Sequence, residues 1–318
     1  MSPRARVFAV VAAAAAVVAG SVVGVTVLQT RGETTTAAAA PVTKARAGIP
    51  PLLFDFGVRN DAEVRDLARG AALLKQGKQE AARAVFMRHT SVQAQIGAAF
   101  STWPDGSLEA VRAIVAAHPA DAVARLHLGI SLYWIGRNAD AVKQFQEVDS
   151  RFPDTPSAVE AEDLLYAGRF IPGLPYMVAP IELPSAPTLA AQLTLARQQS
   201  PLAYGVMLWR LDRRVSARRA LDAAAAAAPK NPVVLTLDAV SHFTKKRPAD
   251  AFGRLGPLTG RFPKSSVVRL HLGLLLLWER QVEKGAQQLR LAASGEPRSI
   301  YAEQAKKLLA KLVRNGTK

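Results

Sequence analysis

An internal duplication limits the possible folds of this chain more than any other feature. The pentapeptide Arg-Leu-His-Leu-Gly occupies residues 125–129 and again residues 269–273, which is 144 residues later. The same register continues without a gap through three further matched pairs: Pro119 and Pro263, Trp134 and Trp278, and Pro153 and Pro297. Self-similarity at a fixed spacing indicates a repeat architecture, so we predict two related halves, at about residues 61–166 and 189–313.

A shorter period of 34 residues runs within each half. Pro229, Pro263 and Pro297 are spaced by 34, and Pro119 and Pro153 share that spacing. Apolar residues follow helical periodicity, as in residues 124–135 followed by 139–152, and no sustained alternating pattern predicts a strand. A unit of two short helices cannot bury its own apolar face, so neighbouring units are expected to stack.

These positions resemble the tetratricopeptide repeat (TPR) family, which has a period of 34 residues. The matching positions are Leu128-Gly129, Ala141, Phe145 and Pro153; Leu272-Gly273, Gly285, Leu289, Ala292 and Pro297; Gly205, Ala217, Leu221, Ala224 and Pro229; and, more weakly, Gly70, Ala82 and Phe86. The resemblance covers about residues 61–153 and 199–297, with residues 91–119 and 233–263 as degenerate copies. It implies an all-α, TPR-like helix-turn-helix solenoid, and it says little about function.

The small residues of each repeat have a physical role. Gly129 and Ala141 allow the two helices of one repeat to approach closely, and Phe145 fills the space between them. Pro153 ends the second helix because proline lacks an N–H group and clashes inside a helix.

The N-terminus predicts a membrane anchor. Arg4 and Arg6 precede an uncharged run at residues 7–28, which as a helix reaches roughly 33 Å and can cross a hydrocarbon core of about 30 Å. The basic tail favours a single-pass protein of the cell membrane with an extracytoplasmic C-terminal domain. A cleaved signal peptide is the alternative, with small residues near Gly20 as the cleavage site.

The rest of the chain divides by composition. We expect six parts: a short cytoplasmic tail at 1–6, a transmembrane helix at 7–28, a flexible Thr/Ala/Pro linker at 29–50, a first TPR-like half with a capping helix at 51–167, a proline-rich ordered connector at 168–188, and a second TPR-like half with a C-terminal capping helix at 189–318. The connector contains five prolines but is too apolar for a free linker.

Few residues suggest chemistry. The chain has no cysteine, and its five histidines lack metal-ligand spacing, so we expect no metal, no cofactor and no enzymatic activity. Asp238 and His242 lie four residues apart and predict a local ion pair. Glu160, Glu162 and Asp163 predict a solvated face of the first capping helix.

A groove lined by the first helix of each repeat is the candidate site. The resemblance to TPR proteins places nine residues there: Lys75, Ile130, Tyr133, Trp134, Val206, Trp209, Arg210, Leu274 and Trp278. Three of the four tryptophans are among them, and aromatic residues often dominate binding energy at interfaces. Packing between repeats is the alternative role of these side chains.

The function expected from these features is a membrane-anchored scaffold of the cell envelope that binds a protein or peptide. The net charge of +16 leaves a second hypothesis open, in which a basic surface binds an anionic wall polymer or lipid. A wall-processing enzyme is the third hypothesis, and no nucleic-acid partner is expected for a domain that faces outward.

Overall fold

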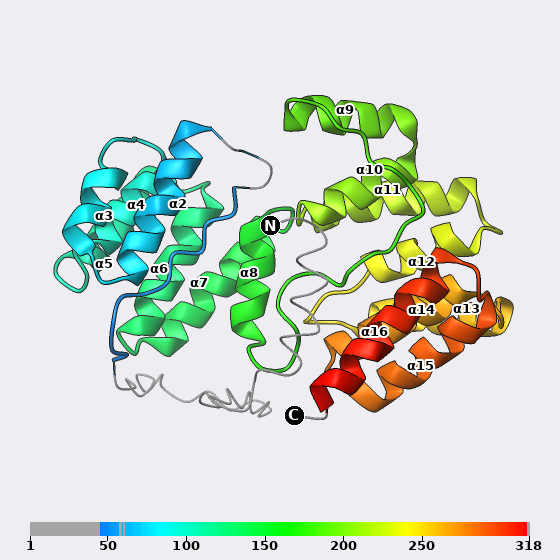
Figure 1. Ribbon diagram of the computed structural model, residues 1–318. Coiled ribbons are helices and arrows are strands. Elements are labelled where there is room, and N and C mark those ends of the chain that lie inside the picture. The colour runs from blue at the N-terminus through cyan, green and yellow to red at the C-terminus, as the bar shows by residue number, and fades with distance from the viewer. Residues whose placement is uncertain (1–44, 57–58, 60, 317–318) are drawn as a thin grey trace, which may run out of the picture. The chain divides into compact units, whose positions relative to one another are not determined.

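The computed structural model describes residues 45–56, 59 and 61–316, and its regular elements in this part of the chain are all α-helices (Figure 1). The all-α fold class expected from the periodicity is therefore confirmed. The predicted tail, the predicted transmembrane helix and residues 29–44 of the predicted linker lie outside the described residues. No helix within the described part combines the length and the apolar composition that crossing a bilayer requires.

The described chain forms two compact units, which divide between Phe152 and Pro153. We call residues 45–152 the first unit and residues 153–316 the second unit. The division falls before α8 (Pro156–Leu165), so this helix belongs to the second unit, whereas the sequence suggests a cap on the first half.

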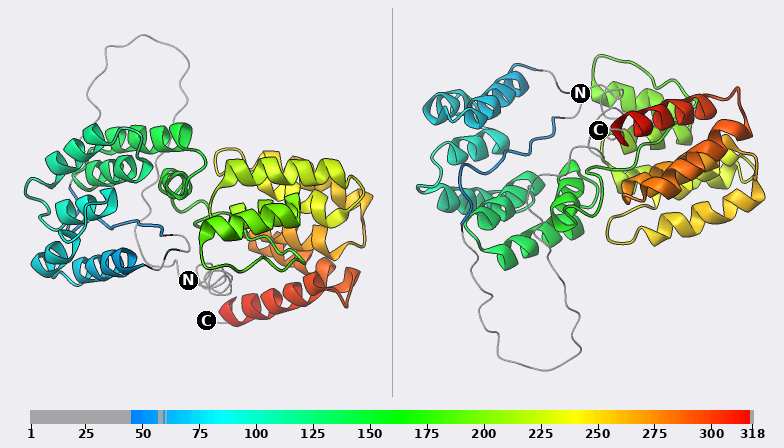
Figure 2. Two further views of the ribbon diagram at one scale, coloured as in Figure 1. Left: turned by 90° about the horizontal axis from the view of Figure 1, so that it is seen from above. Right: turned by 60° about the horizontal axis from the view of Figure 1, so that its bottom comes forward.

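The first unit consists of three helix pairs. They are α2 (Ala62–Lys75) with α3 (Gln79–Phe86), α4 (Val92–Phe100) with α5 (Ser107–Ala117), and α6 (Ala122–Trp134) with α7 (Asn138–Arg151). Each helix packs against the next one in chain order, and α4 also contacts both α2 and α6 (Figure 2). This order of contacts is that of stacked helix-turn-helix repeats.

The second unit also contains three helix pairs, with additional helices at both ends. The elements are α8, α9 (Leu189–Gln199), α10 (Pro201–Arg210) with α11 (Arg214–Ala227), α12 (Pro232–Ser241) with α13 (Ala249–Arg261), α14 (Ser266–Trp278) with α15 (Val282–Gly295), and α16 (Ile300–Gly316). Helices α12, α14 and α16 contact one another in succession. The segments expected to be degenerate copies, 91–119 and 233–263, therefore each form a helix pair.

The repeating prolines follow the helix ends as expected. α5, α7, α11, α13 and α15 each end two residues before a proline, namely Pro119, Pro153, Pro229, Pro263 and Pro297. The helix starts are also encoded locally. Asp121, for example, caps α6 through a side-chain oxygen that accepts a hydrogen bond from the Ala124 amide at 2.8 Å.

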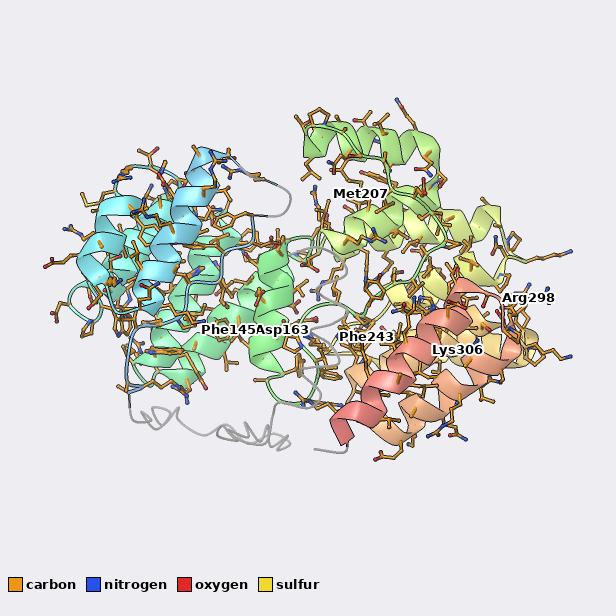
Figure 3. All side chains as sticks on the ribbon, in the orientation of Figure 1. Phe145, Asp163, Met207, Phe243, Arg298 and Lys306 are labelled. Atoms are coloured by element: carbon orange, nitrogen blue, oxygen red, sulfur yellow. The ribbon has the colours of Figure 1, made fainter. Side chains whose placement is uncertain are left out.

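Close packing at glycine holds the helices of one repeat together. A Cβ atom placed on Gly129 would lie 2.5 Å from Cε1 of Phe145, whose side chain is labelled in Figure 3. Gly205 is in the same situation, because its Cβ would lie 2.7 Å from Leu221. The predicted pairing of a small residue on one helix with a large one on the next is therefore confirmed.

The 34-residue period also determines the core of the second unit. Leu221, Leu255 and Leu289 occupy equivalent positions on α11, α13 and α15, and each side chain is fully buried. Burial of a leucine contributes roughly 1.5–3 kcal/mol, so this repeated position stabilises each of the three helix pairs in the same way.

Candidate functional site

Four of the nine predicted groove residues contact extended segments of the chain itself. These four are Tyr133, Trp134, Trp209 and Trp278. Ile130, Val206 and Leu274 are instead buried in the core, Arg210 is half-buried, and Lys75 is exposed near the end of α2. That these positions bind a partner stays a prediction.

The first extended segment, residues 45–56, lies along α6 in the first unit (Figure 1). The amide of Arg46 donates to the carbonyl of Trp134 at 2.7 Å, and the Trp134 indole N–H donates to the carbonyl of Gly48 at 3.1 Å. Further along, the amide of Leu53 donates to Nε2 of His127 at 3.1 Å. The sequence predicts a flexible linker through residue 50, whereas in the structure Arg46 and Gly48, which lie within its last five residues, are hydrogen-bonded to α6.

The side chain of Arg46 is bound at the C-terminal end of α6. Its guanidinium carbon lies 3.3 Å from the centroid of the Tyr133 ring, and Nη1 donates to the carbonyl of Tyr133 and to Oδ1 of Asn138. A cation is favoured there because the last carbonyls of a helix carry partial negative charge and an aromatic face attracts cations. This end of α6 is therefore a small cation site.

The second extended segment, residues 170–183, lies on α10 and α14 in the second unit. The amide of Ile171 donates to the carbonyl of Trp278 at 3.0 Å, and the Trp278 indole donates to the carbonyl of Gly173 at 3.4 Å. The indole of Trp209 donates to the carbonyl of Pro175 at 2.7 Å.

The histidine contact is also repeated in the second unit. The amide of Val178 donates to Nε2 of His271 at 3.0 Å. Each extended segment therefore makes the same three contacts within its own unit. Corresponding residues in the segments are separated by 125 positions: Arg46 and Ile171, Gly48 and Gly173, and Leu53 and Val178.

The two segments also share a backbone bend. Gly48 has φ +79° and Gly173 has φ +84°, which is the left-handed region that glycine adopts without strain. The residues that follow have a common pattern, Gly-Ile-Pro-Pro-Leu-Leu in one segment and Gly-Leu-Pro-Tyr-Met-Val in the other. The pattern is the sequence signal for these segments, but its offset of 125 differs from the 144 that relates the helices.

The histidines in these contacts are neutral acceptors. Nδ1 of His127 lies 2.7 Å from the carbonyl of Val123, and Nδ1 of His271 lies 2.8 Å from that of Val267. With the proton on Nδ1, Nε2 keeps a lone pair for the amide of the extended segment. Burial lowers the pKa of both imidazoles to about 4, although the hydrogen bond to the backbone carbonyl opposes the shift.

Two of the three acidic side chains of α8, Glu162 and Asp163, form ion pairs with residues elsewhere in the unit, which corrects the expectation of a solvated face for these two residues. Glu162 is 2% exposed and lies 2.8 Å from Nη1 of Arg214 on α11. Asp163 pairs with Lys245, which is also buried and follows α12. These two pairs attach α8 to the second unit, and burial lowers the pKa of Lys245 to about 8.

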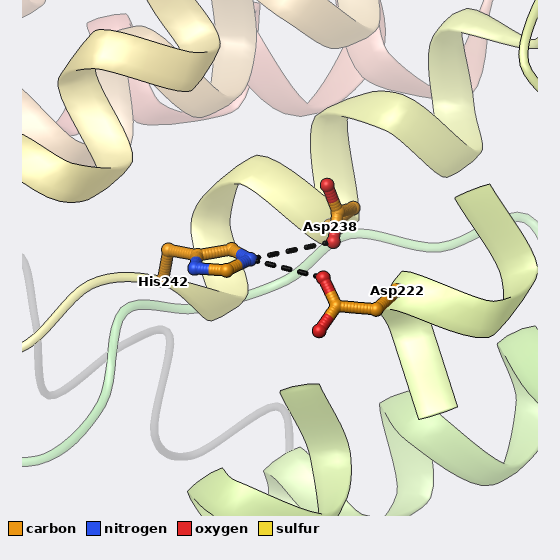
Figure 4. Close-up of side chains that lie close together, drawn as sticks. All are labelled: Asp222, Asp238 and His242. Carbon is orange, nitrogen blue, oxygen red and sulfur yellow. Dashed lines mark hydrogen bonds and ion pairs between the residues drawn. The ribbon is translucent and has the colours of Figure 1, made fainter. Parts of the chain in front are cut away.

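A cluster of Asp222, Asp238 and His242 joins α11 to the end of α12 (Figure 4). Nε2 of His242 lies 3.1 Å from Oδ1 of Asp222 and 3.6 Å from Oδ1 of Asp238, so the two side chains that the sequence pairs, Asp238 and His242, are in contact. Arg254 approaches the far oxygen of Asp238 at 3.7 Å.

The carboxyl groups of this cluster titrate differently. Burial and the hydrogen bond with Asp222 raise the pKa of Asp238 to about 7. Burial alone would raise the pKa of Asp222, but hydrogen bonds with Asp238 and His242 lower it below its usual value. Asp238 is therefore about half protonated near pH 7, and in its protonated form it can share a proton with Asp222 across the two helices.

Comparisons with known proteins assign no family to this chain. No protein-family model and no curated protein matches the sequence. A tetratricopeptide repeat protein from Parabacteroides merdae is 11% identical over 79% of this chain and 98% of that one, with a TM-score of 0.30. Yeast Tom70 is 14% identical over 80% of this chain and 54% of its own length, also with a TM-score of 0.30. These scores are too low to assign a family, so the repeat fold is established by the helices themselves.

Proposed function

We propose that the chain is a membrane-anchored, non-enzymatic scaffold that binds extended segments of a partner protein on the first helices of its repeats. One observation carries the proposal: Trp134, Trp209 and Trp278 each donate an indole N–H to a backbone carbonyl of an extended segment. The helix surfaces therefore already have the donors that such a ligand requires.

The geometry suits peptide recognition for two physical reasons. Tryptophan offers a large apolar face and a polar N–H, and such residues often dominate the energy of an interface. The contacts of Trp134 and His127 with the first segment are made to backbone atoms, so a ligand with different side chains can form the same hydrogen bonds. Side-chain contacts, such as that of Arg46 on Tyr133, then add specificity.

The membrane part of the proposal rests on the sequence. The uncharged run at residues 7–28 follows two arginines, and we infer that it anchors the protein with the repeats outside the cytoplasm. Protease added to spheroplasts, whose cell membrane is intact, should digest the C-terminal region and leave a fragment that the membrane protects. Complete protection of the repeats would contradict the proposed orientation.

Site-specific photo-crosslinking in native membranes tests the scaffold function. The photoreactive residue p-benzoylphenylalanine replaces Tyr133, and in the control it replaces Lys143, whose side chain is 71% exposed on α7. We expect a discrete protein adduct from position 133 that Trp134→Ala weakens and that persists at high salt. Equal adducts from both positions would refute the assigned surface.

The same experiment separates the second hypothesis. Binding of an anionic wall polymer or lipid by the basic surface would fall steeply with salt, because exposed charges are screened, and would not depend on Trp134. That result would replace the peptide scaffold by a charge-driven function.

A further inference from the structure

The first extended segment differs from the second in how firmly it is held. In the second segment the side chains of Phe170, Ile171 and Met177 are 4%, 3% and 2% exposed and belong to the core of the unit. In the first segment only Pro50 is buried. Residues 52–54 are half-buried. When this segment leaves its site, less buried apolar surface becomes exposed to water than when the second segment does.

The two segments also differ in the residue two positions before the glycine bend, which is Arg46 in the first segment and Ile171 in the second. Ile171 is buried among apolar side chains, so removing the second segment would open the core. Arg46 instead lies on the Tyr133 ring at the end of α6, where its departure exposes a cation site and little apolar surface. Leaving its site would therefore expose less apolar surface for the first segment than for the second.

From this contrast we propose that residues 45–56 are a resident ligand, which a partner protein displaces with an extended segment of the same pattern. The pattern is a basic residue, one residue of any type, glycine, isoleucine or leucine, proline, one residue of any type, and two apolar residues. The inference rests on the proposed function and specifies the ligand and the way in which it gains access.

Each element of the pattern corresponds to a contact. The basic residue lies on Tyr133 and the carbonyls at the end of α6. Glycine adopts the left-handed bend that presents its carbonyl to Trp134, and the proline after it is buried in both segments. The apolar pair places an amide on the imidazole of His127.

Competition with the tethered segment determines the expected affinity. A segment joined to its site by a short connection acts at an effective concentration on the order of millimolar, so a free peptide binds the intact protein weakly. Weakening the resident segment should raise the affinity for the peptide by the same factor. Gly48→Ala does this through backbone strain, since φ is +79° and a Cβ atom there would meet no other atom within 4 Å.

The test uses the full chain and a fluorescein-labelled peptide with the sequence of residues 44–56. Fluorescence anisotropy measures the affinity of the protein for this peptide. We expect Gly48→Ala to tighten peptide binding about tenfold, because alanine disfavours the left-handed conformation. Arg46→Ala should also tighten it, and this change leaves the backbone conformation unaffected. A peptide with alanine at the position of its own glycine, or Tyr133→Ala in the protein, should lose the gain.

Gly173→Ala is the matched control. Its φ is +84° and its added Cβ would also meet nothing within 4 Å, so the strain is the same in a segment that we assign as permanent. We expect a lower melting temperature and no tighter binding of the peptide. Equal tightening by both variants would overturn the assignment of one exchangeable segment.

Two further outcomes would overturn the proposal. The first is unchanged peptide affinity in Gly48→Ala and Arg46→Ala variants that remain folded by circular dichroism. The second is a doubled mass in light scattering for these variants, which would show exchange of residues 45–56 between two copies of the chain. Loss of the crosslinked adduct at position 133 with retained peptide binding would refute the scaffold function alone.

Discussion

Acidification should force protons onto His127 and His271, and this gives the most direct test of how the extended segments are held. Each imidazole accepts a hydrogen bond from a segment amide at Nε2, so the charged form loses that acceptor. Because each histidine is fully buried, the charged form also lacks solvation.

The size of the effect follows from the pKa values. The pKa of both histidines is lowered from 6.5 to about 4 in the folded protein, first by burial. The unfolded chain then binds more protons between these values, so stability is complete above pH 6.5 and is lost as the pH falls towards 4. At about 1.4 kcal/mol per pH unit, each histidine removes roughly 3 kcal/mol over this range.

Nuclear magnetic resonance of the imidazole C–H groups measures these values directly. The signals of His127 and His271 should keep the shifts of the neutral form down to about pH 5. The variants His127→Gln and His271→Gln assign the two signals, and each should reduce the loss of stability between pH 6.5 and 4.5. Hydrogen exchange at the amides of Leu53 and Val178 should accelerate over the same range, beyond the intrinsic pH dependence.

Titration of both signals near pH 6.5 would refute the reasoning. It would mean that water reaches the imidazoles, and therefore that the extended segments do not cover them. Depression of the pKa at His271 alone would indicate that only the second segment stays in place, in agreement with an exchangeable first segment.

Three further changes test the packing and the buried charges. Gly129→Ala should lower the free energy of unfolding by about 1–3 kcal/mol, because the new methyl group overlaps an aromatic ring. Gly253→Ala has open space around the new methyl group and should raise the free energy of unfolding by up to about 1 kcal/mol. Melting temperatures that shift in the same direction for both variants would contradict this. Glu162→Gln should cost about 3 kcal/mol in chemical denaturation, because it removes the carboxylate that lies 2.8 Å from the buried guanidinium of Arg214, and apolar replacement of both partners should restore most of it. Asp238→Asn should stabilise the protein by about 1–3 kcal/mol at pH 8 and have little effect at pH 5. The pKa of Asp238 is raised in the folded protein, so its ionisation lowers the free energy of unfolding as the pH rises through 7. Equal effects at both pH values would exclude proton sharing.

The helix pairs could be predicted because their determinants are local and periodic. Gly129, Phe145 and Pro153 recur at fixed spacings, and each acts on its own helix or on the next one along the chain. The degenerate repeats form helix pairs as well, because apolar periodicity and neighbouring repeats suffice where one consensus residue is missing.

The ion pairs of α8 could not be predicted in this way. Glu162 and Asp163 read as a solvated face because their partners, Arg214 and Lys245, are more than fifty residues away in the sequence. Only the tertiary arrangement brings these opposite charges together, and it also attaches α8 to the second unit.

The spacing of residues along the chain was enough to predict a helical repeat protein and to identify the tryptophans of the first helices as the side chains of interest. Tertiary structure alone decided what those tryptophans contact. The extended segments have no periodic side-chain pattern, since they are held through backbone amides and carbonyls, and every residue type except proline supplies both groups. Their hydrogen bonds therefore left only a short trace in the sequence, the glycine, the apolar residue and the proline shared by residues 48–50 and 173–175.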